Sequence, residues 1–209
     1  MICEPKHLLG IIDLRKRPRT GRQRWYAPSR VSSKKKTICF HHTAVSGGFG
    51  VSKQALRKHA GADVHALPWL ESPRGGVLDG VMPRAAALAD RYDGLPYHAI
   101  YTHALRILYI LLPFDWVTWH ASNRDINTRS LGFAWDGDSR SESPPVAHLH
   151  AAIRYVLEMG GEDGHDICEV STHNRWANKP HCPGAVFDTR VLDPLCDTLR
   201  LSKIGPGDI

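Results

Sequence analysis

The sequence has 209 residues, of which 42% are hydrophobic and 23% charged, and these proportions exclude a largely disordered chain. Lys and Arg total 27 against 21 Asp and Glu, giving a formal net charge of +6, and the five cysteines, an odd number, argue against a disulfide framework. No apolar run approaches the length of a membrane span, and the short apolar patch at residues 8–12 is followed by basic residues, unlike a secretory signal. We therefore expect a protein made in the cytoplasm, without stable membrane insertion.

Basic residues dominate the first part of the chain, residues 1–36. Two runs of positive charge, at residues 15–19 and 32–36, flank an aromatic pair, Trp25 and Tyr26. Charge runs are usually solvated surface, and the alternative is contact with an anionic polymer. No helix-turn-helix, zinc-finger or RNA-binding signature accompanies them, so we expect no specific nucleic-acid partner. We interpret residues 1–36 as a basic lead-in that packs on the domain or leads into it.

The pattern of apolar residues and turn signals predicts alternating strands and helices. The predicted strands cover residues 37–42, 97–101, 107–112 and 131–135. The predicted helices cover residues 51–59 and 82–92, a segment that follows Pro144-Pro145 and ends at Gly160-Gly161, and residues 188–199. The predicted loops are 43–50, 61–80, a polar loop at 121–129 and a frayed tail around Gly205-Pro206-Gly207. This order predicts an α/β fold, a single domain with a mixed sheet flanked by helices, over residues 37–202, with a tail at 203–209.

Histidines gather in four segments beside predicted turns or strand ends, at residues 40–43, 96–98, 119–123 and 171–184. Zinc in proteins is bound by imidazole nitrogens and thiolates, and a catalytic zinc keeps three protein ligands. His173 and Cys182 are nine residues apart, enough for a loop to present both to one ion. Successive strand residues face opposite sides, so either His41 or His42 would supply the third ligand, and the pattern alone does not choose between them.

Taken together and in this order, the four segments resemble the motifs of the zinc-dependent N-acetylmuramoyl-L-alanine amidases, the family that includes T-odd phage lysozymes and peptidoglycan recognition proteins. The resemblance runs from about residue 37 to residue 200. The matching motifs are Phe40-His41-His42-Thr43-Ala44, Leu95-Pro96-Tyr97-His98-Ala99-Ile100, Trp119-His120-Ala121 with Asn127-Thr128-Arg129-Ser130-Leu131-Gly132, and Thr172-His173-Asn174-Arg175 with Lys179-Pro180-His181-Cys182-Pro183-Gly184.

The resemblance implies roles for particular residues. It makes His41, His173 and Cys182 the ligands of a Zn²⁺ cofactor, with His42 packed behind the strand, and it makes Tyr97 the catalytic tyrosine. Phage enzymes of this kind carry a catalytic lysine shortly before the cysteine ligand. This sequence departs from that pattern, and the alternatives for that role are His181, Lys179 or neither of the two.

A substrate-binding rim is predicted next to these residues. The polar segment with His120, Asn123, Asn127 and Arg129 suits sugar hydroxyls and stem-peptide carboxylates, although Asn and Ser also build turns for purely structural reasons. Trp176, within the ligand-bearing loop, is the candidate for an aromatic side chain that faces the substrate.

The resemblance implies an endolysin that hydrolyses the amide bond between N-acetylmuramic acid and the L-alanine of the stem peptide in bacterial peptidoglycan. Such an enzyme would reach the cell wall through a holin-type membrane lesion, and the basic lead-in would contact an anionic cell-envelope surface. Two alternatives stay open. One is a protein of the same fold that binds peptidoglycan without cutting it, for which a lost cysteine ligand would be typical. The other is a nucleic-acid or polymerase-binding regulator, which only the positive charge favours.

Overall fold

The computed structural model describes residues 10–13, 15, 34–42, 97–103, 106–140, 142–177 and 181–208. The helices predicted at 51–59 and 82–92, the loops at 43–50 and 61–80, and Lys179 lie outside the described residues. So does most of the basic lead-in.

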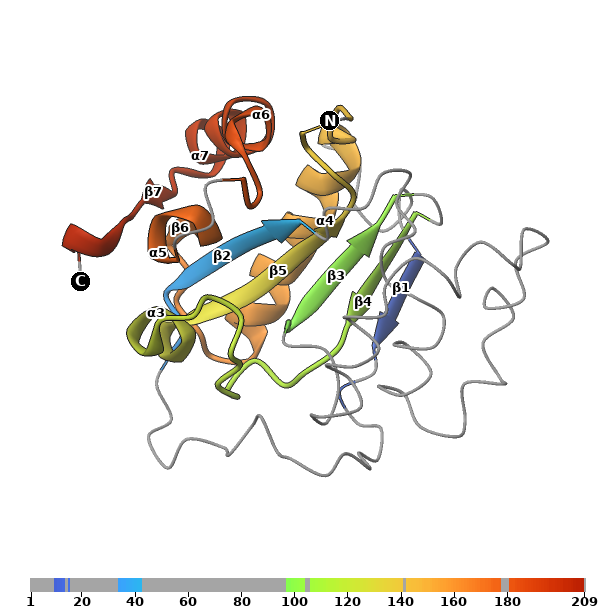
Figure 1. Cartoon of the computed structure of the whole chain (residues 1–209). Coiled ribbons are helices and arrows are strands. Elements are labelled where there is room, and N and C mark those ends of the chain that lie inside the picture. Colours follow the sequence, from blue (N-terminus) through green and yellow to red (C-terminus); the bar gives the residue numbers. More distant parts are fainter. Residues whose placement is uncertain are drawn as a thin grey trace, which may run out of the picture.

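Seven strands form one sheet in the order β1-β4-β3-β5-β2-β6-β7. The strands are β1 (Gly10–Asp13), β2 (Thr37–His42), β3 (Ala99–Thr102), β4 (Ile107–Ile110), β5 (Ser130–Asp136), β6 (Glu169–Thr172) and β7 (Ser202–Lys203). The pair of β3 and β4 is antiparallel and the other pairs are parallel, so the sheet is mixed, as predicted (Figure 1). In this order β2 is an interior strand, with β5 on one side and β6 on the other.

The helices are α3 (Arg124–Arg129), α4 (Val146–Glu162), α5 (His173–Trp176), α6 (Ala185–Phe187) and α7 (Asp193–Leu199). A π-helical turn, Asp188–Leu192, joins α6 to α7, and a 3-10 turn covers Pro206–Asp208. The helix after Pro144-Pro145 is confirmed, but it continues through Gly160 and Gly161 to Glu162. A Cβ atom at Gly160 would lie 2.6 Å from Ile167 Cδ1, so this glycine serves close packing rather than helix termination.

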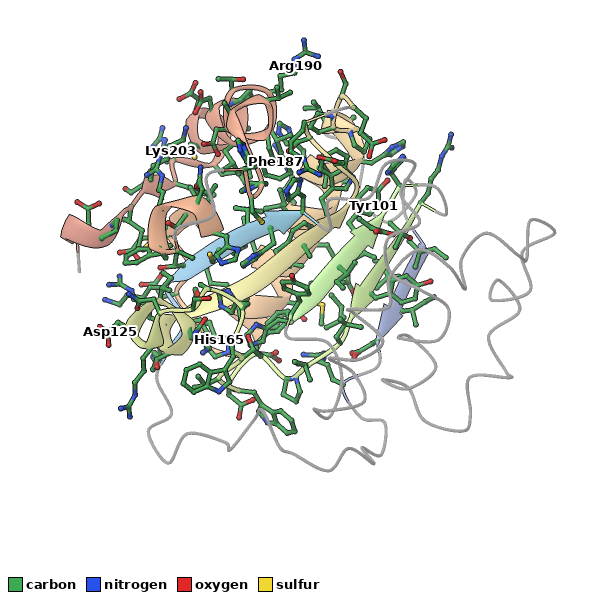
Figure 2. All side chains as sticks on the ribbon, viewed as in Figure 1. Tyr101, Asp125, His165, Phe187, Arg190 and Lys203 are labelled. Atoms are coloured by element: carbon green, nitrogen blue, oxygen red, sulfur yellow. The ribbon has the colours of Figure 1, made fainter. Side chains whose placement is uncertain are left out.

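The two faces of β2 have different surroundings. Ile38 and Phe40 point into the main core, which β5, α4 and α7 also line, and Figure 1 shows α4 running behind the sheet. Phe187, labelled in Figure 2, packs its ring 5.7 Å from that of Phe40 on this side. Cys39 lies on the other face, in a small cluster with Ala121 and Ile126. The alternation of β2 therefore assigns His41 to the Cys39 face, away from the main core.

The polar segment at 121–129, predicted to be a loop, contains the helix α3. Asn123 caps this helix, because its side-chain oxygen accepts hydrogen bonds from the backbone N–H groups of Asp125 and Ile126. The local Asn and Ser residues therefore do build structure, through a helix cap rather than a turn.

The sheet extends beyond residues 37–202 in both directions. β1, within the basic lead-in, pairs with β4, and β7 pairs with β6. Ile204 is buried and its N–H donates to the carbonyl of Val170, so the tail is held against the sheet up to this point. Among the described residues, no helix is long and apolar enough to cross a membrane.

Candidate metal centre

His41 lies near the carboxyl end of β2 and is 1% exposed. The neighbouring strand β6 runs parallel to β2 and ends at Thr172, so the two strands end at the same edge of the sheet. His173 follows β6 directly, as the first residue of α5. The topology thus brings two histidines that are far apart in the sequence to one place.

Cys182 reaches the same place through a returning loop. The backbone N–H of Asn174 donates to the carbonyl oxygen of Cys182 at 2.8 Å, which ties the cysteine beside His173. The ligand atoms of His41, His173 and Cys182 all lie within 4.8 Å of one another. The Cys182 sulfur is 4.0 Å from Nδ1 of His41, and the rings of His41 and His173 are 4.6 Å apart.

These three donors suit a zinc ion chemically. A nitrogen and a sulfur on one tetrahedral zinc stand about 3.6 Å apart, so small adjustments would bring His41 and Cys182 into range. Burial lowers the pKa of His41 well below its ordinary value, which keeps the imidazole in the neutral, metal-binding form. Burial raises the pKa of the Cys182 thiol to about 11, so a metal would displace a proton there. Two imidazoles and one thiolate would leave a fourth position for substrate or water.

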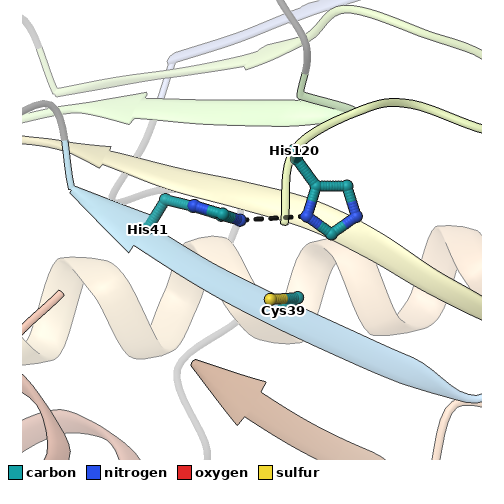
Figure 3. A group of neighbouring side chains, drawn as sticks. All are labelled: Cys39, His41 and His120. Carbon is teal, nitrogen blue, oxygen red and sulfur yellow. Dashed lines mark hydrogen bonds between the residues drawn. The ribbon is translucent and has the colours of Figure 1, made fainter. Parts of the chain in front are cut away.

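A second cluster shares His41. Ligand atoms of Cys39, His41 and His120 also lie within 4.8 Å of one another, and all three residues are buried (Figure 3). Nε2 of His41 and Nδ1 of His120 are 3.0 Å apart, which is a hydrogen-bond distance. We call Cys39, His41 and His120 the inner cluster, and His41, His173 and Cys182 the outer cluster.

Tyr97 lies beside the outer cluster. Its ring centroid is 5.1 Å from that of His41, and the side chain is half-buried just before β3. Burial raises the pKa of the phenol above its ordinary value, with the nearby Cys182 and Cys39 adding to the effect, so the hydroxyl stays a hydrogen-bond donor at neutral pH. His181 is exposed next to Cys182.

Three residues of the predicted substrate-binding rim have side chains that contact other parts of the protein. His120 is 5% exposed and contacts His41. Asn127 is fully buried, and its side-chain oxygen accepts from the backbone N–H of Ala121 at 2.8 Å. Asn123, as described above, caps α3. The side chains of these three residues thus bind other groups of the protein. This is the structural role that the sequence analysis gave as the alternative to substrate binding.

The other two predicted contacts also have partners within the protein. Arg129 forms a salt bridge of 2.5 Å to Glu169, which in addition accepts from the hydroxyl of Thr37. Thr37 begins β2, four residues before His41, or about 13 Å along the strand. The indole N–H of Trp176 donates to the Ser171 hydroxyl at 2.6 Å. Arg129 therefore lies towards the opposite end of β2 from the outer cluster.

Two residues that were not among the predicted site residues contact His120. Ser130, the first residue of β5, contacts Nε2 of His120 at 3.0 Å. Gly132 lies against the His120 ring, where an added Cβ would stand 2.8 Å from Cγ of the histidine. Both residues belong to the matched motif of residues 127–132, and that match was the available signal. His42, on the opposite face of β2, is buried, with Nδ1 3.7 Å from a carboxylate oxygen of Asp138.

The chain is similar to a known protein family in sequence and to several solved structures in fold. A family model described as N-acetylmuramoyl-L-alanine amidase matches residues 32–185. The solved structure of the endolysin amidase LysCS from Clostridium intestinale is similar with a TM-score of 0.52 and 16% identity, over 93% of this chain and 98% of that one. Wild-type PGRP-LB from Drosophila has a TM-score of 0.55 and 16% identity, over 94% and 98%. No curated protein sequence matches significantly. At such identities the structural likeness shows a shared fold.

Proposed function

Because the chain belongs to the N-acetylmuramoyl-L-alanine amidase family, we propose that it is a zinc-dependent hydrolase of the amide bond between N-acetylmuramic acid and L-alanine in peptidoglycan. The observation that carries the proposal is the convergence of His41, His173 and Cys182 within 4.8 Å. The non-catalytic alternative on this fold is disfavoured by the complete donor set, since loss of the cysteine would be its typical mark.

When bound, zinc lowers the pKa of a water ligand towards 7 and polarises a carbonyl group, the two activations that an unreactive amide requires. The phenol of Tyr97, kept protonated by burial, donates a hydrogen bond either to the attacking water or to the oxygen on which negative charge develops. His181, exposed beside Cys182, is our candidate for the group that delivers a proton to the leaving amine. Lys179 is the alternative for this last role.

The bond that is cut can be identified directly from products. Purified peptidoglycan is digested with the full chain, with and without a zinc chelator, and the soluble products are analysed by mass spectrometry. Free stem peptides beginning with L-alanine, released from intact glycan only without chelator, are the expected result. Cleaved glycan would indicate a glycosidase, and retention of the protein on the wall without products would indicate binding alone. Either outcome would overturn the proposal.

We further propose that the protein acts as an endolysin, reaching the wall through a holin-type lesion, and that exposed basic residues of the lead-in contact an anionic envelope. Lys34 and Lys36 are exposed, whereas Lys35 is fully buried and donates to the carbonyl of Thr128. The surface test therefore uses Lys34→Glu with Lys36→Glu. Weaker lysis of permeabilised cells, with a flatter salt dependence, is expected, and unchanged lysis would contradict the contact.

A further inference from the structure

A continuous chain of hydrogen-bonding groups runs from α3 to the candidate metal site. It begins at the carbonyl oxygen of Ile126, which is 2.5 Å from the hydroxyl oxygen of Ser130. The same hydroxyl is 3.0 Å from Nε2 of His120. Nδ1 of His120 is in turn 3.0 Å from Nε2 of His41, the contact drawn as a dashed line in Figure 3. Nδ1 of His41 faces Cys182 at 4.0 Å.

The positions of the hydrogens along this chain follow from its first member. A carbonyl oxygen only accepts, so the single hydrogen of the Ser130 hydroxyl points to Ile126. The hydroxyl oxygen must then accept from Nε2–H of His120. In the neutral ring, Nδ1 of His120 is left as an acceptor for Nε2–H of His41. Nδ1 of His41 therefore carries the lone pair, and this is the nitrogen on the side of Cys182.

The surrounding residues hold His120 in the required place. Gly132 in β5 leaves room for the imidazole, because an added Cβ would lie 2.8 Å from its Cγ. Asn127, fully buried, binds the backbone N–H of Ala121, the residue after His120. The motif residues of this region thus converge on one imidazole, although they are spread over thirteen positions of the sequence.

In the inner cluster a hydrogen bond already occupies the space between the two histidine nitrogens. Two nitrogens bound to one tetrahedral zinc stand about 3.3 Å apart, with the ion between them. The His41 and His120 nitrogens are 3.0 Å apart, and a hydrogen lies between them in the order derived above. Cys39 completes the cluster but stands outside the hydrogen-bond chain.

We propose that His120 is a positioning residue that fixes the tautomer of His41, so that Nδ1 of His41 is presented to the zinc, and that Ser130 fixes the tautomer of His120. The inference rests on the proposed zinc function. It gives His120 a task inside the protein in place of the substrate contact predicted for it, and it explains why a serine and a glycine follow in β5.

The first experiment needs neither zinc nor substrate. In zinc-free protein with ¹⁵N-labelled histidines, a two-bond ¹H–¹⁵N spectrum distinguishes protonated from unprotonated ring nitrogens. We expect both His41 and His120 to carry their hydrogen on Nε2, and Ser130→Ala to give His120 a mixture of tautomers. A hydrogen on Nδ1 of His41 in the wild-type protein would overturn the proposal.

The second experiment measures zinc affinity by competition with a chelating dye. His120→Leu keeps the bulk of the ring but removes the acceptor, and it should weaken zinc binding about 10- to 100-fold, as is typical when the partner of a metal-bound histidine is lost. His120→Asn restores an oxygen acceptor near the place of Nδ1 and should stay closer to wild type than to His120→Leu. Equal losses in both variants would reduce His120 to a packing role and contradict the inference.

Cys39→Ala is the matched control within the inner cluster. Because Cys39 is outside the hydrogen-bond chain, zinc affinity should be unchanged. A loss as large as that of His120→Leu would mean that the inner cluster itself binds the metal. Failure of the wild-type protein to bind zinc would overturn the proposed function instead, whereas wild-type affinity in His120→Leu would overturn only this inference.

Discussion

The inner and outer clusters contain the same kinds of side chain and share His41, yet they differ in what lies between their atoms. In the inner cluster His41 and His120 are already joined at 3.0 Å by a hydrogen bond, and all three members are buried. In the outer cluster His173 and Cys182 are half-buried, and Tyr97 lies alongside. Proximity of histidines and cysteines alone therefore does not define a metal site. Under the proposed function, the placement of hydrogens and the access of a ligand distinguish the supporting inner cluster from the metal-binding outer cluster.

The largest effect is expected when the outer cluster loses a ligand. His173→Ala should lower the release of stem peptide to the detection limit and leave less than stoichiometric zinc after dialysis, because a catalytic zinc needs its three protein ligands. The control is His165→Ala, at a half-buried histidine outside both clusters. Full activity and full zinc content in His173→Ala would remove the distinction between the two clusters.

Acid should unfold the zinc-free protein through its buried histidines. Burial lowers the pKa of His42 to about 4 and that of His98 to about 3, from an ordinary value of 6.5. Below pH 6.5 these two histidines are protonated in the unfolded chain but stay neutral in the folded protein. The free energy of unfolding therefore falls as the pH falls. Two such groups give about 2 kcal/mol per pH unit between pH 6 and 4. Urea unfolding at several pH values measures the slope, and a flat profile would contradict neutral buried rings.

The amino end of β2 should matter for stability rather than for metal binding. Lys35 is fully buried beside the last turn of α3, and burial lowers its pKa to about 8. Lys35→Glu would bury an unpaired carboxylate and should cost about 3–5 kcal/mol of unfolding free energy. Lys34→Glu, at the exposed neighbour, should stay within about 0.5 kcal/mol. Equal tolerance of both changes in urea unfolding would contradict the burial of Lys35.

Tyr97 tests the role of the phenol beside the outer cluster. Tyr97→Phe removes only the hydroxyl and should lower turnover about 10²- to 10³-fold while zinc content stays constant, because the lost donor acts on developing charge. Tyr101→Phe is the matched control, since Tyr101 is buried on the main-core face of the same strand region. A Tyr97→Phe enzyme with normal turnover would leave the phenol without a role.

The smallest effect is expected at Arg129. Its salt bridge to Glu169 lies near the start of β2, so Arg129→Ala should lower the free energy of unfolding by about 1 kcal/mol. The Michaelis constant for soluble peptidoglycan fragments should not change. A raised Michaelis constant with unchanged stability would restore the substrate contact that the sequence predicts for this residue.

Strand periodicity made much of the sheet predictable. Residues 37–42 and 131–135 show the alternating or continuous apolar patterns that are typical of buried strands. Both segments are strands in the structure, β2 and β5. β6 was not predicted, and neither were β1 and β7, which lie at the two edges of the sheet. Their pairing depends on long-range contacts with β4 and β6, which a local pattern does not contain.

The candidate ligands could be named from motifs, whereas the neighbours of His41 could not. Spacing indicated that His173 and Cys182 share a loop, and the strand pattern alone left His41 and His42 equivalent. The polar residues of 121–129 are as compatible with a substrate-binding rim as with a structural role. Asn occurs in helix caps, as a buried amide and in surface contacts with ligands, and the sequence does not distinguish these roles. Only the fold shows Asn127 buried and His120 against His41.

Zinc K-edge absorption on Cys39→Ala tests most directly which cluster holds the metal. The variant retains Cys182 and lacks the cysteine of the inner cluster, so the sulfur signal reports on one side chain. We predict that the zinc-loaded variant keeps one sulfur neighbour at about 2.3 Å with nitrogens at about 2.0 Å, as in the wild-type protein. Loss of the sulfur neighbour in Cys39→Ala would place the metal in the inner cluster and contradict the account.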